Sequence, residues 1–172
     1  TYEDYLFRMA DGNMDAAFRT LALKSFSGIA SSGNSLERLY HIWNDPSEAT
    51  RYRASESDLI EYSYMLAVHF PEKADEILAQ QLSRITNPDR RKEYEFVMQA
   101  LSPEKVQRKA FFEQLMLPEN WTVEPWAQTA LRWLNPPVRY PESLDYIRPA
   151  PVPYTHLTLP TKRIGQRCAP SL

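Results

Sequence analysis

The 172-residue chain has few of the residue types from which catalytic and metal centres are usually recognised. It has one cysteine, Cys168, so it has neither a disulfide framework nor a cysteine-based metal site. None of its three histidines has another histidine three or four residues away, which excludes the H-E-x-x-H zinc pattern. With only four glycines, it also lacks the glycine-rich run of a phosphate-binding loop.

Long apolar runs and a strong excess of charge are missing as well. The mean hydropathy is -0.53 and no apolar run is long enough for a transmembrane helix, so no membrane span is expected. A net charge of -2 gives no basic surface for nucleic acid, which we exclude as a partner. Thr1–Asp4 has no initiator methionine and no signal-peptide pattern, so we expect the chain to begin within a longer protein. No compartment is indicated.

Proline, in contrast, is plentiful, and many of the 14 prolines stand where a helix would start. Proline is tolerated there because the N–H that it lacks would be unpaired in any case. Ser55 with Asp58 resembles a capping box, and Asn87-Pro88 reads as an N-cap followed by proline. After helices over about 2–10 and 14–29, further helices are predicted to start near residues 35, 57, 72, 88, 103, 123 and 141. The segment Ala49–Ala54 is predicted to be a loop.

Apolar residues at helical spacing predict which face of each helix is buried. The helix over 57–70 is apolar on nearly all sides, which is typical of a helix in the middle of a stack. Among the other side chains expected to be buried are Met14, Ala17, Phe18, Leu21, Ser25 and Ile29 in the second helix, Val106, Ala110, Phe111 and Leu115 after residue 103, and Trp126 as the main core anchor.

The spacing of the helix starts predicts one helix pair about every 30 to 40 residues, which is the period of stacked-hairpin arrays. No residue-level repeat signature recurs. We therefore predict an all-α fold over residues 1–150, an irregular superhelix of antiparallel helix pairs of the HEAT or armadillo kind, with no sheet.

The last 22 residues have a different character. Tyr154–Thr161, which could be read as a short edge strand, resembles a transposase-type sequencing adapter translated into an open frame. We therefore expect residues 151–172 to be a non-native, disordered tail, and we leave its His156 and Cys168 out of any site. The tail holds three of the 20 basic residues and none of the 22 acidic ones, so the rest of the chain is more acidic than the total.

The remaining polar residues do not form a recognisable catalytic set. His41 and His69 are predicted to be structural, and Ser27-Gly28 lacks the G-x-S-x-G context of a nucleophile, although a Ser/His/Asp constellation stays open. The acidic pairs Asp75-Glu76 and Glu93/Glu95 are expected on solvated helix faces. Six aromatic residues could line a peptide groove, but the helical spacing favours a place in the core: Tyr62, Tyr64, Phe111, Phe112, Trp126 and Trp133. The sequence thus predicts no catalytic, cofactor-binding or metal-ligating residue.

One ordered set of short motifs carries a family resemblance. The motifs are Asn87-Pro88-Asp89-Arg90, Leu101-Ser102, Arg108, Phe111-Phe112, Glu119-Asn120, Glu124-Pro125-Trp126, Leu134-Asn135, and Glu142-Ser143 with Tyr146-Ile147. In this order they resemble the C-terminal helical domain of zinc aminopeptidases of the aminopeptidase N and puromycin-sensitive type. The resemblance covers about residues 58–149 well and the earlier helices loosely. It departs at Trp121, where the family has a basic residue, and at Pro136, where it has a histidine.

The resemblance implies a parent enzyme that removes N-terminal residues from peptides. In that family an upstream domain holds zinc through H-E-x-x-H and a downstream glutamate, and the helical domain covers the catalytic chamber and limits which peptides enter. No catalytic residue can be carried over to this chain, so we expect the fragment alone to be inactive. Its partners would be the upstream catalytic domain of the same polypeptide and the peptide substrates.

The alternative is a stand-alone helical-repeat scaffold that binds a protein partner on its concave face. That reading needs polar capping helices at both ends. A truncated stack would instead leave apolar faces open at its ends, and we expect residues 1–150 alone to self-associate or to be only marginally stable.

Overall fold

The computed structural model describes residues 1–117 and 124–147, and this part of the chain contains helices and no strand. The predicted all-α fold is therefore confirmed, whereas the irregular superhelix of antiparallel helix pairs of the HEAT or armadillo kind stays a prediction. The helices are α1 (Tyr2–Asp11), α2 (Ala16–Ile29), α3 (Gly33–Asn44), α4 (Pro46–Arg51), α5 (Glu56–His69), α6 (Ala74–Arg84), α7 (Pro88–Val97), α8 (Lys105–Leu115), α9 (Glu124–Leu134) and α10 (Tyr140–Ile147), with the 3-10 turns η1 (Pro71–Lys73), η2 (Met98–Leu101) and η4 (Pro137–Arg139). The predicted tail over 151–172 lies outside the described residues.

Two of the predicted helix starts form as expected. The backbone N–H of Asp58 donates to Ser55 Oγ at 3.2 Å and the Ser55 N–H donates to Asp58 Oδ2 at 2.9 Å, which completes the capping box of α5. At α7, Asn87 Oδ1 accepts from the N–H groups of Asp89 and Arg90 at 2.9 and 3.1 Å. Local polar chemistry is thus sufficient to fix where these helices begin.

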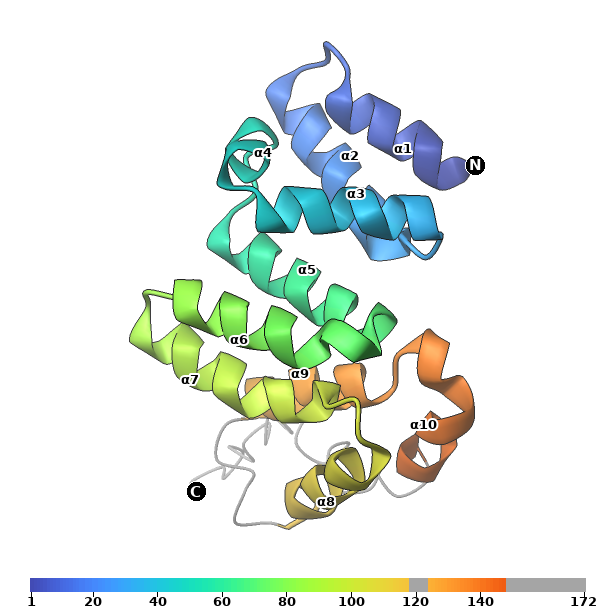
Figure 1. The fold of residues 1–172 in the computed structure, drawn as a ribbon, viewed down its shortest axis with the longest axis vertical. Helices are drawn as coiled ribbons and strands as arrows, with labels where there is room; N and C mark the ends of the chain where they lie inside the picture. The colour runs from blue at the N-terminus through green and yellow to red at the C-terminus, as the bar shows by residue number, and fades with distance from the viewer. Residues whose placement is uncertain (118–123, 148–172) are drawn as a thin grey trace, which may run out of the picture.

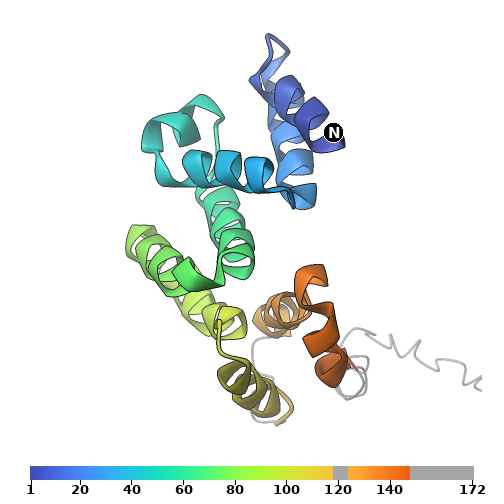
Figure 2. The same ribbon diagram turned by 45° about the vertical axis from the view of Figure 1, so that its right-hand side comes forward.

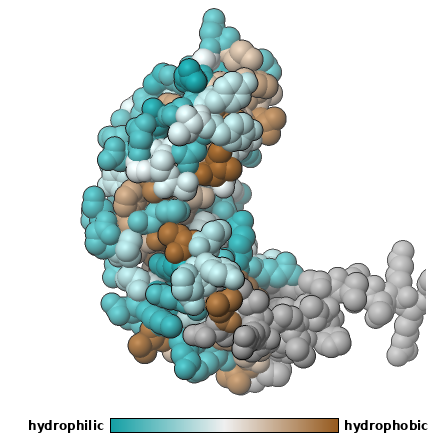
Figure 3. All heavy atoms as spheres, turned by 90° about the vertical axis from the view of Figure 1, so that its right-hand side faces the viewer, coloured by the Kyte–Doolittle hydropathy of each residue, from teal (hydrophilic) through white to brown (hydrophobic). Residues whose placement is uncertain are grey.

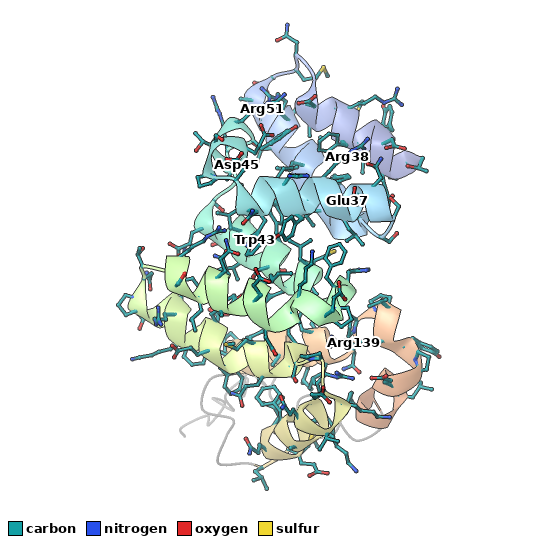
Figure 4. All side chains as sticks on the ribbon, in the orientation of Figure 1. Glu37, Arg38, Trp43, Asp45, Arg51 and Arg139 are labelled. Atoms are coloured by element: carbon teal, nitrogen blue, oxygen red, sulfur yellow. The ribbon has the colours of Figure 1, made fainter. Side chains whose placement is uncertain are left out.

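The region around α3 and α4 differs from the prediction. The N-cap of α3 is Ser32 and not a residue near 35. The loop predicted at Ala49–Ala54 is wrong for residues 49–51, which belong to α4, whereas residues 52–54 lie outside any helix. Asp45 is both the C-cap of α3 and the N-cap of α4, and its side chain accepts from the Ser47 N–H at 2.8 Å (Figure 4). With Pro46 as the first helical residue, the chain turns a corner and starts a new helix at once.

The helices are stacked along the long axis of the molecule (Figure 1). α1 packs on α2 at one end, α5 lies in the middle between α3 and α6, and α7 packs on α9 towards the other end. Figure 2 shows that the stack is curved, with α1–α2 and α9–α10 on the same side of α5. In the space-filling view the outline is concave on that side, where apolar side chains appear among polar ones (Figure 3). None of the helices in the described ranges is long and apolar enough to span a membrane.

The buried apolar residues form two clusters that meet at α5. Tyr64, Ala67 and Val68 belong to the larger cluster, which extends through α6, α7, α8 and α9. Tyr62 and Leu66, on other faces of α5, belong to the cluster of α1, α2 and α3. The prediction that the helix apolar on nearly all sides lies in the middle of the stack is confirmed.

The buried face of α2 was predicted wrongly. The predicted stripe is exposed, with Phe18 at 38% and Leu21 at 62% of full exposure, and α2 instead buries Ala22, Leu23 and Phe26. The reason is that α2 has apolar residues on two adjacent faces, and α1 covers only one of them. Of the eleven large apolar side chains that are exposed in the described ranges, six lie in residues 1–29.

The buried face of α8 is also rotated from the prediction. Val106 is 79% exposed and Ala110 is exposed, whereas Phe111 and Leu115 are buried as expected. Arg108 takes the inward position. Arg108 is only 3% exposed. Its burial is possible because its guanidinium donates to the backbone carbonyls of residues 102 and 103 and to a glutamate on α10.

Trp126 was expected to be the main core anchor of α9, but it is only partly buried. Its ring lies against Phe96, with 6.0 Å between the centroids. The buried face of α9 is formed by Ala127, Ala130 and Trp133. The predicted N-cap of this helix, Thr122, lies outside the described residues.

Candidate functional site

The part of the chain that the structure describes has an open groove of about 710 Å³ on the concave side of the stack. Its walls come from the end of α2, from α5, and from the end of α9 with η4. The lining residues are Gly28, Ile29, Ala30, Ser31, Glu61, Met65, Val68, His69, Arg132, Trp133, Asn135, Pro136, Pro137 and Val138. This volume lies within the usual range of ligand sites.

Local sequence explains why the chain changes direction at the groove. Asn135 ends α9 because its side-chain amide donates to the Leu131 carbonyl at 2.8 Å, and Pro136-Pro137 cannot continue the helix. The chain then enters η4, which brings Val138 to the rim of the groove. On the opposite wall, α2 ends at Ile29, and the Ala30 N–H donates to the carbonyl of Phe26.

Much of the groove surface is apolar. Met65 and Val68 of α5 line it next to Trp133 of α9, whose ring meets Tyr64 edge-on at 5.6 Å between the centroids. Ile29 and Val138 stand at its edges and are 40% and 53% exposed. A groove of this kind favours apolar side chains of a bound molecule over charged ones.

One ion pair crosses the groove wall between α5 and α9. Arg132 Nη2 lies 2.8 Å from Glu61 Oε1, and the guanidinium also lies over the Trp133 ring at 5.1 Å from its centroid. Both side chains of the pair are about half exposed, so their attraction is screened and contributes little to stability. The pair is therefore available for exchange with polar groups of a ligand.

His69 is the histidine among the residues that line the groove. Burial lowers its pKa from the ordinary value, and the positive charge of Arg139 on η4 lowers it further (Figure 4). His69 is therefore neutral at pH 7, with one ring nitrogen as a donor and the other as an acceptor. It offers a hydrogen bond to a ligand and not a charge.

The other polar candidates do not join this site. His41 lies on α3 with its ring edge-on to Tyr40 at 6.4 Å, and Ser27 Oγ donates to the carbonyl of Lys24 in its own helix at 2.9 Å. Glu95 pairs with Arg91 one turn away at 3.2 Å. The side chains of Asp75, Glu76 and Glu95 are exposed on α6 and α7, as predicted for solvated helix faces, while Glu93 is partly buried.

No grouping of three or more histidine, cysteine, aspartate or glutamate side chains with the geometry of a metal site occurs in the described ranges. Of the six aromatic residues weighed as groove or core, Tyr62, Tyr64, Phe111, Phe112 and Trp133 are buried, which favours the core interpretation. Trp133 serves both purposes, since it also lines the groove.

Most of the groove could not have been found in the sequence. Its three walls come from residues 28–31, 61–69 and 132–138 of the chain, and Glu61 and Arg132 meet only through the packing of α5 on α9. The one signal in the sequence was the double proline at Pro136-Pro137. It predicted that a helix ends there, but it did not show that this helix end would line a groove.

Comparison with protein-family models, with curated proteins and with solved structures finds no match to this chain.

Proposed function

We propose that this chain is a non-catalytic part of the helical C-terminal domain of a zinc aminopeptidase and that its concave face borders the chamber in which peptides are bound. The zinc and the general base would be held by an upstream domain of the same polypeptide. The role of the helices would be to position a wall with a groove and to limit which peptides reach the metal.

The observation that carries this proposal is the groove itself. It lies on the concave side, has an apolar surface, and offers one neutral imidazole and one exchangeable ion pair as its polar groups. Such a surface can contact peptides of many sequences without reacting with them. This is the property that a chamber wall requires.

A second observation supports the resemblance. Several motif residues that are far apart in the chain depend on one another in the fold. Arg108 donates to the carbonyl of Ser102 at 2.7 Å and pairs with Glu142, and the Phe112 ring packs on Tyr146 with 5.0 Å between the centroids. An ordered set of motifs whose members pack together is more specific than the same motifs taken singly.

The decisive experiment is to read the gene on both sides of this segment from the same source DNA. We expect an upstream frame with H-E-x-x-H, and a helix that continues beyond Pro149 in place of the adapter-like tail. A start codon directly before Thr1, together with a genomic Tyr154–Leu172, would overturn both expectations.

The whole protein then allows a test of the groove. In Ile29→Arg and Val138→Arg, a long charged side chain at the rim should lower kcat/KM for peptides of about ten residues at least threefold relative to a single-residue chromogenic substrate. The matched control is Val106→Arg, which alters a 79% exposed residue on α8 that does not line the groove. An unchanged ratio in the two rim variants would contradict a chamber wall.

The alternative from another class is a stand-alone scaffold that binds a protein partner in the same groove. Terminal helices of such arrays have polar outer faces. Here Tyr2 and Tyr5 of α1 and Leu21 of α2 are exposed, which favours the aminopeptidase proposal. A complete gene without a zinc motif would favour the scaffold.

A further inference from the structure

A second, much smaller cavity lies where the connection between α1 and α2 meets the end of α4. It holds about 60 Å³. Its lining residues are Ala10, Met14, Ala16, Arg19, Thr20, Arg51, Tyr52 and Arg53. Three of these eight residues are arginines: Arg19 of α2, Arg51 at the last position of α4, and Arg53, the residue after the C-cap of α4. Figure 4 labels Arg51.

The three guanidinium groups are only partly neutralised by the residues around them. Arg51 Nη2 lies 2.6 Å from Asp11 Oδ1, and Arg51 Nη1 lies 3.4 Å from Glu48 Oε1. Arg19 uses its Nε to donate to the carbonyl of Ala10 at 2.8 Å, and its two terminal nitrogens make no hydrogen bond with any residue that the structure describes. The Arg53 side chain makes no hydrogen bond or ion pair with any residue that the structure describes.

The cavity therefore has three positive charges against two carboxylates. Arg51 and Arg53 are exposed, so solvent screens part of the repulsion between these charges, and a bound anion would neutralise the excess positive charge. Tyr52 does not add a negative charge, because burial and its hydrogen bond to Asp11 raise the pKa of its hydroxyl to about 12.

The backbone holds Arg53 at the cavity in a conformation that is unusual for a residue with a side chain. Its φ is 55°, in the left-handed region. The Ala54 N–H donates to the Ala49 carbonyl at 2.9 Å and the Arg53 N–H to the Thr50 carbonyl at 3.1 Å, which is the pattern of a Schellman cap. Glycine adopts this left-handed conformation without strain, so an arginine at this position lowers the stability of the fold.

We propose that this cavity binds a single tetrahedral oxyanion, with inorganic phosphate as its simplest form. The cavity of about 60 Å³ is open to solvent on one side and has room for a small anion. The planar donor groups of Arg19 and Arg53 match the oxygens of such an ion, and Arg51, held by its carboxylates, contributes charge. This site is separate from the concave groove and does not depend on the function proposed for it.

The test uses the substitution Arg53→Gly in the 172-residue chain, because it removes the guanidinium and relieves the left-handed strain at the same time. The probe is sodium phosphate, compared with sodium chloride at equal ionic strength. In the unaltered protein, phosphate at ten times its Kd should raise the Tm by about 2–4 °C. In Arg53→Gly the Tm in chloride should be higher than that of the unaltered protein, and the additional effect of phosphate should be lost.

A phosphorus NMR titration measures the same binding directly, with an expected loss of affinity of at least tenfold in Arg53→Gly and in Arg19→Gln. The matched control is Arg90→Ala, which removes an arginine that is about half exposed and pairs with Glu56 on another surface, and which should keep the phosphate response. Equal binding of O-phosphoserine would identify phosphate esters as the source, and preference for the inorganic ion would identify the free anion. A full phosphate response in Arg53→Gly, or none in the unaltered protein, would overturn the proposal.

Discussion

α2 and α5 are both 14 residues long and similarly apolar, yet they have different surroundings. α5 lies between α3 and α6 and buries residues on most of its sides, including Tyr62 and Tyr64 on different faces. α2 buries one face against α1 and leaves Phe18 and Leu21 exposed. The difference shows that the apolar content of a helix predicts how much of it could be covered, while its neighbours decide how much is covered.

The largest effect is expected at the aromatic centre of α5. Tyr64 is 2% exposed, stacks on Tyr94 with 5.0 Å between the centroids, and meets Trp133 edge-on. Tyr64→Ala should lower the free energy of unfolding by about 3–5 kcal/mol, since it leaves a cavity in the larger cluster. Phe18→Ala on α2 is the matched control and should cost less than about 1 kcal/mol, because Phe18 is 38% exposed. Urea unfolding measures both, and equal losses would contradict the contrast between the two helices.

The next effect concerns the polar part of the second half of the stack. Arg108→Ala removes charge-assisted hydrogen bonds to one buried and one partly buried carbonyl group and should cost about 2–3 kcal/mol. Arg90→Ala, which breaks the exposed pair with Glu56, should change stability by less than about 1 kcal/mol. Thermal unfolding of the two variants compares them, and an Arg108→Ala protein as stable as Arg90→Ala would show that the network is unimportant.

A pH dependence is expected from the first half of the stack. Glu3 is 8% exposed and accepts hydrogen bonds from Ser31, Ser32 and Ser35, which lower its pKa from 4.5 to about 2. Because the folded state favours the carboxylate, this stabilisation is present above pH 4.5 and is lost as the pH falls from about 4.5 to 2.

Glu3→Gln should cost about 1–3 kcal/mol at pH 7 and make stability less dependent on pH in that range. Asp4, whose pKa is also lowered to about 2 by its contacts with Thr1 and Arg38, is only partly buried, so solvent screens these contacts. Asp4→Asn is the comparison variant and should lose less stability than Glu3→Gln. Urea midpoints at pH 7, 4 and 3 measure the effect. If the urea midpoint of Glu3→Gln depends on pH as strongly as that of the unaltered protein, Glu3 is not the source of the acid sensitivity.

The smallest effect on stability is expected from the exposed stripe of α2. The double variant Phe18→Glu with Leu21→Glu should change the free energy of unfolding by less than about 0.5 kcal/mol per site, because neither side chain is buried. It should nevertheless reduce self-association of residues 1–150, which we expect because this face is apolar and exposed. Sedimentation velocity over a range of concentrations measures it. A monodisperse monomer at high concentration in the unaltered protein would contradict the expectation.

What the sequence allowed us to predict was mainly local. The caps at Ser55 and Asn87 form as expected because each needs only residues two or three positions away. The all-α class follows from such signals added along the chain. The first half of the loop predicted at Ala49–Ala54 was wrong, because six residues are enough for a short helix once Asp45 and Pro46 start it.

The features that depend on distant partners were not predictable. The inward turn of Arg108 needs a glutamate 34 residues later, and the open face of α2 depends on which helices lie beside it. The groove needs three segments that only the packing brings together. The sequence indicated a stack of helices, and the concave face of that stack had to come from the structure.

The position of α5 in both core clusters has a consequence for the dynamics of the chain. A helix shared by two clusters couples them, so neither half of the stack can open without exposing apolar surface of the other. Hydrogen exchange should therefore be slowest at the amides of α5, which open only with the whole fold, and faster at α1, whose contacts are chiefly with α2. Dividing the chain between α5 and α6 should leave no independently folding half, so that residues 1–147 behave as one cooperative unit.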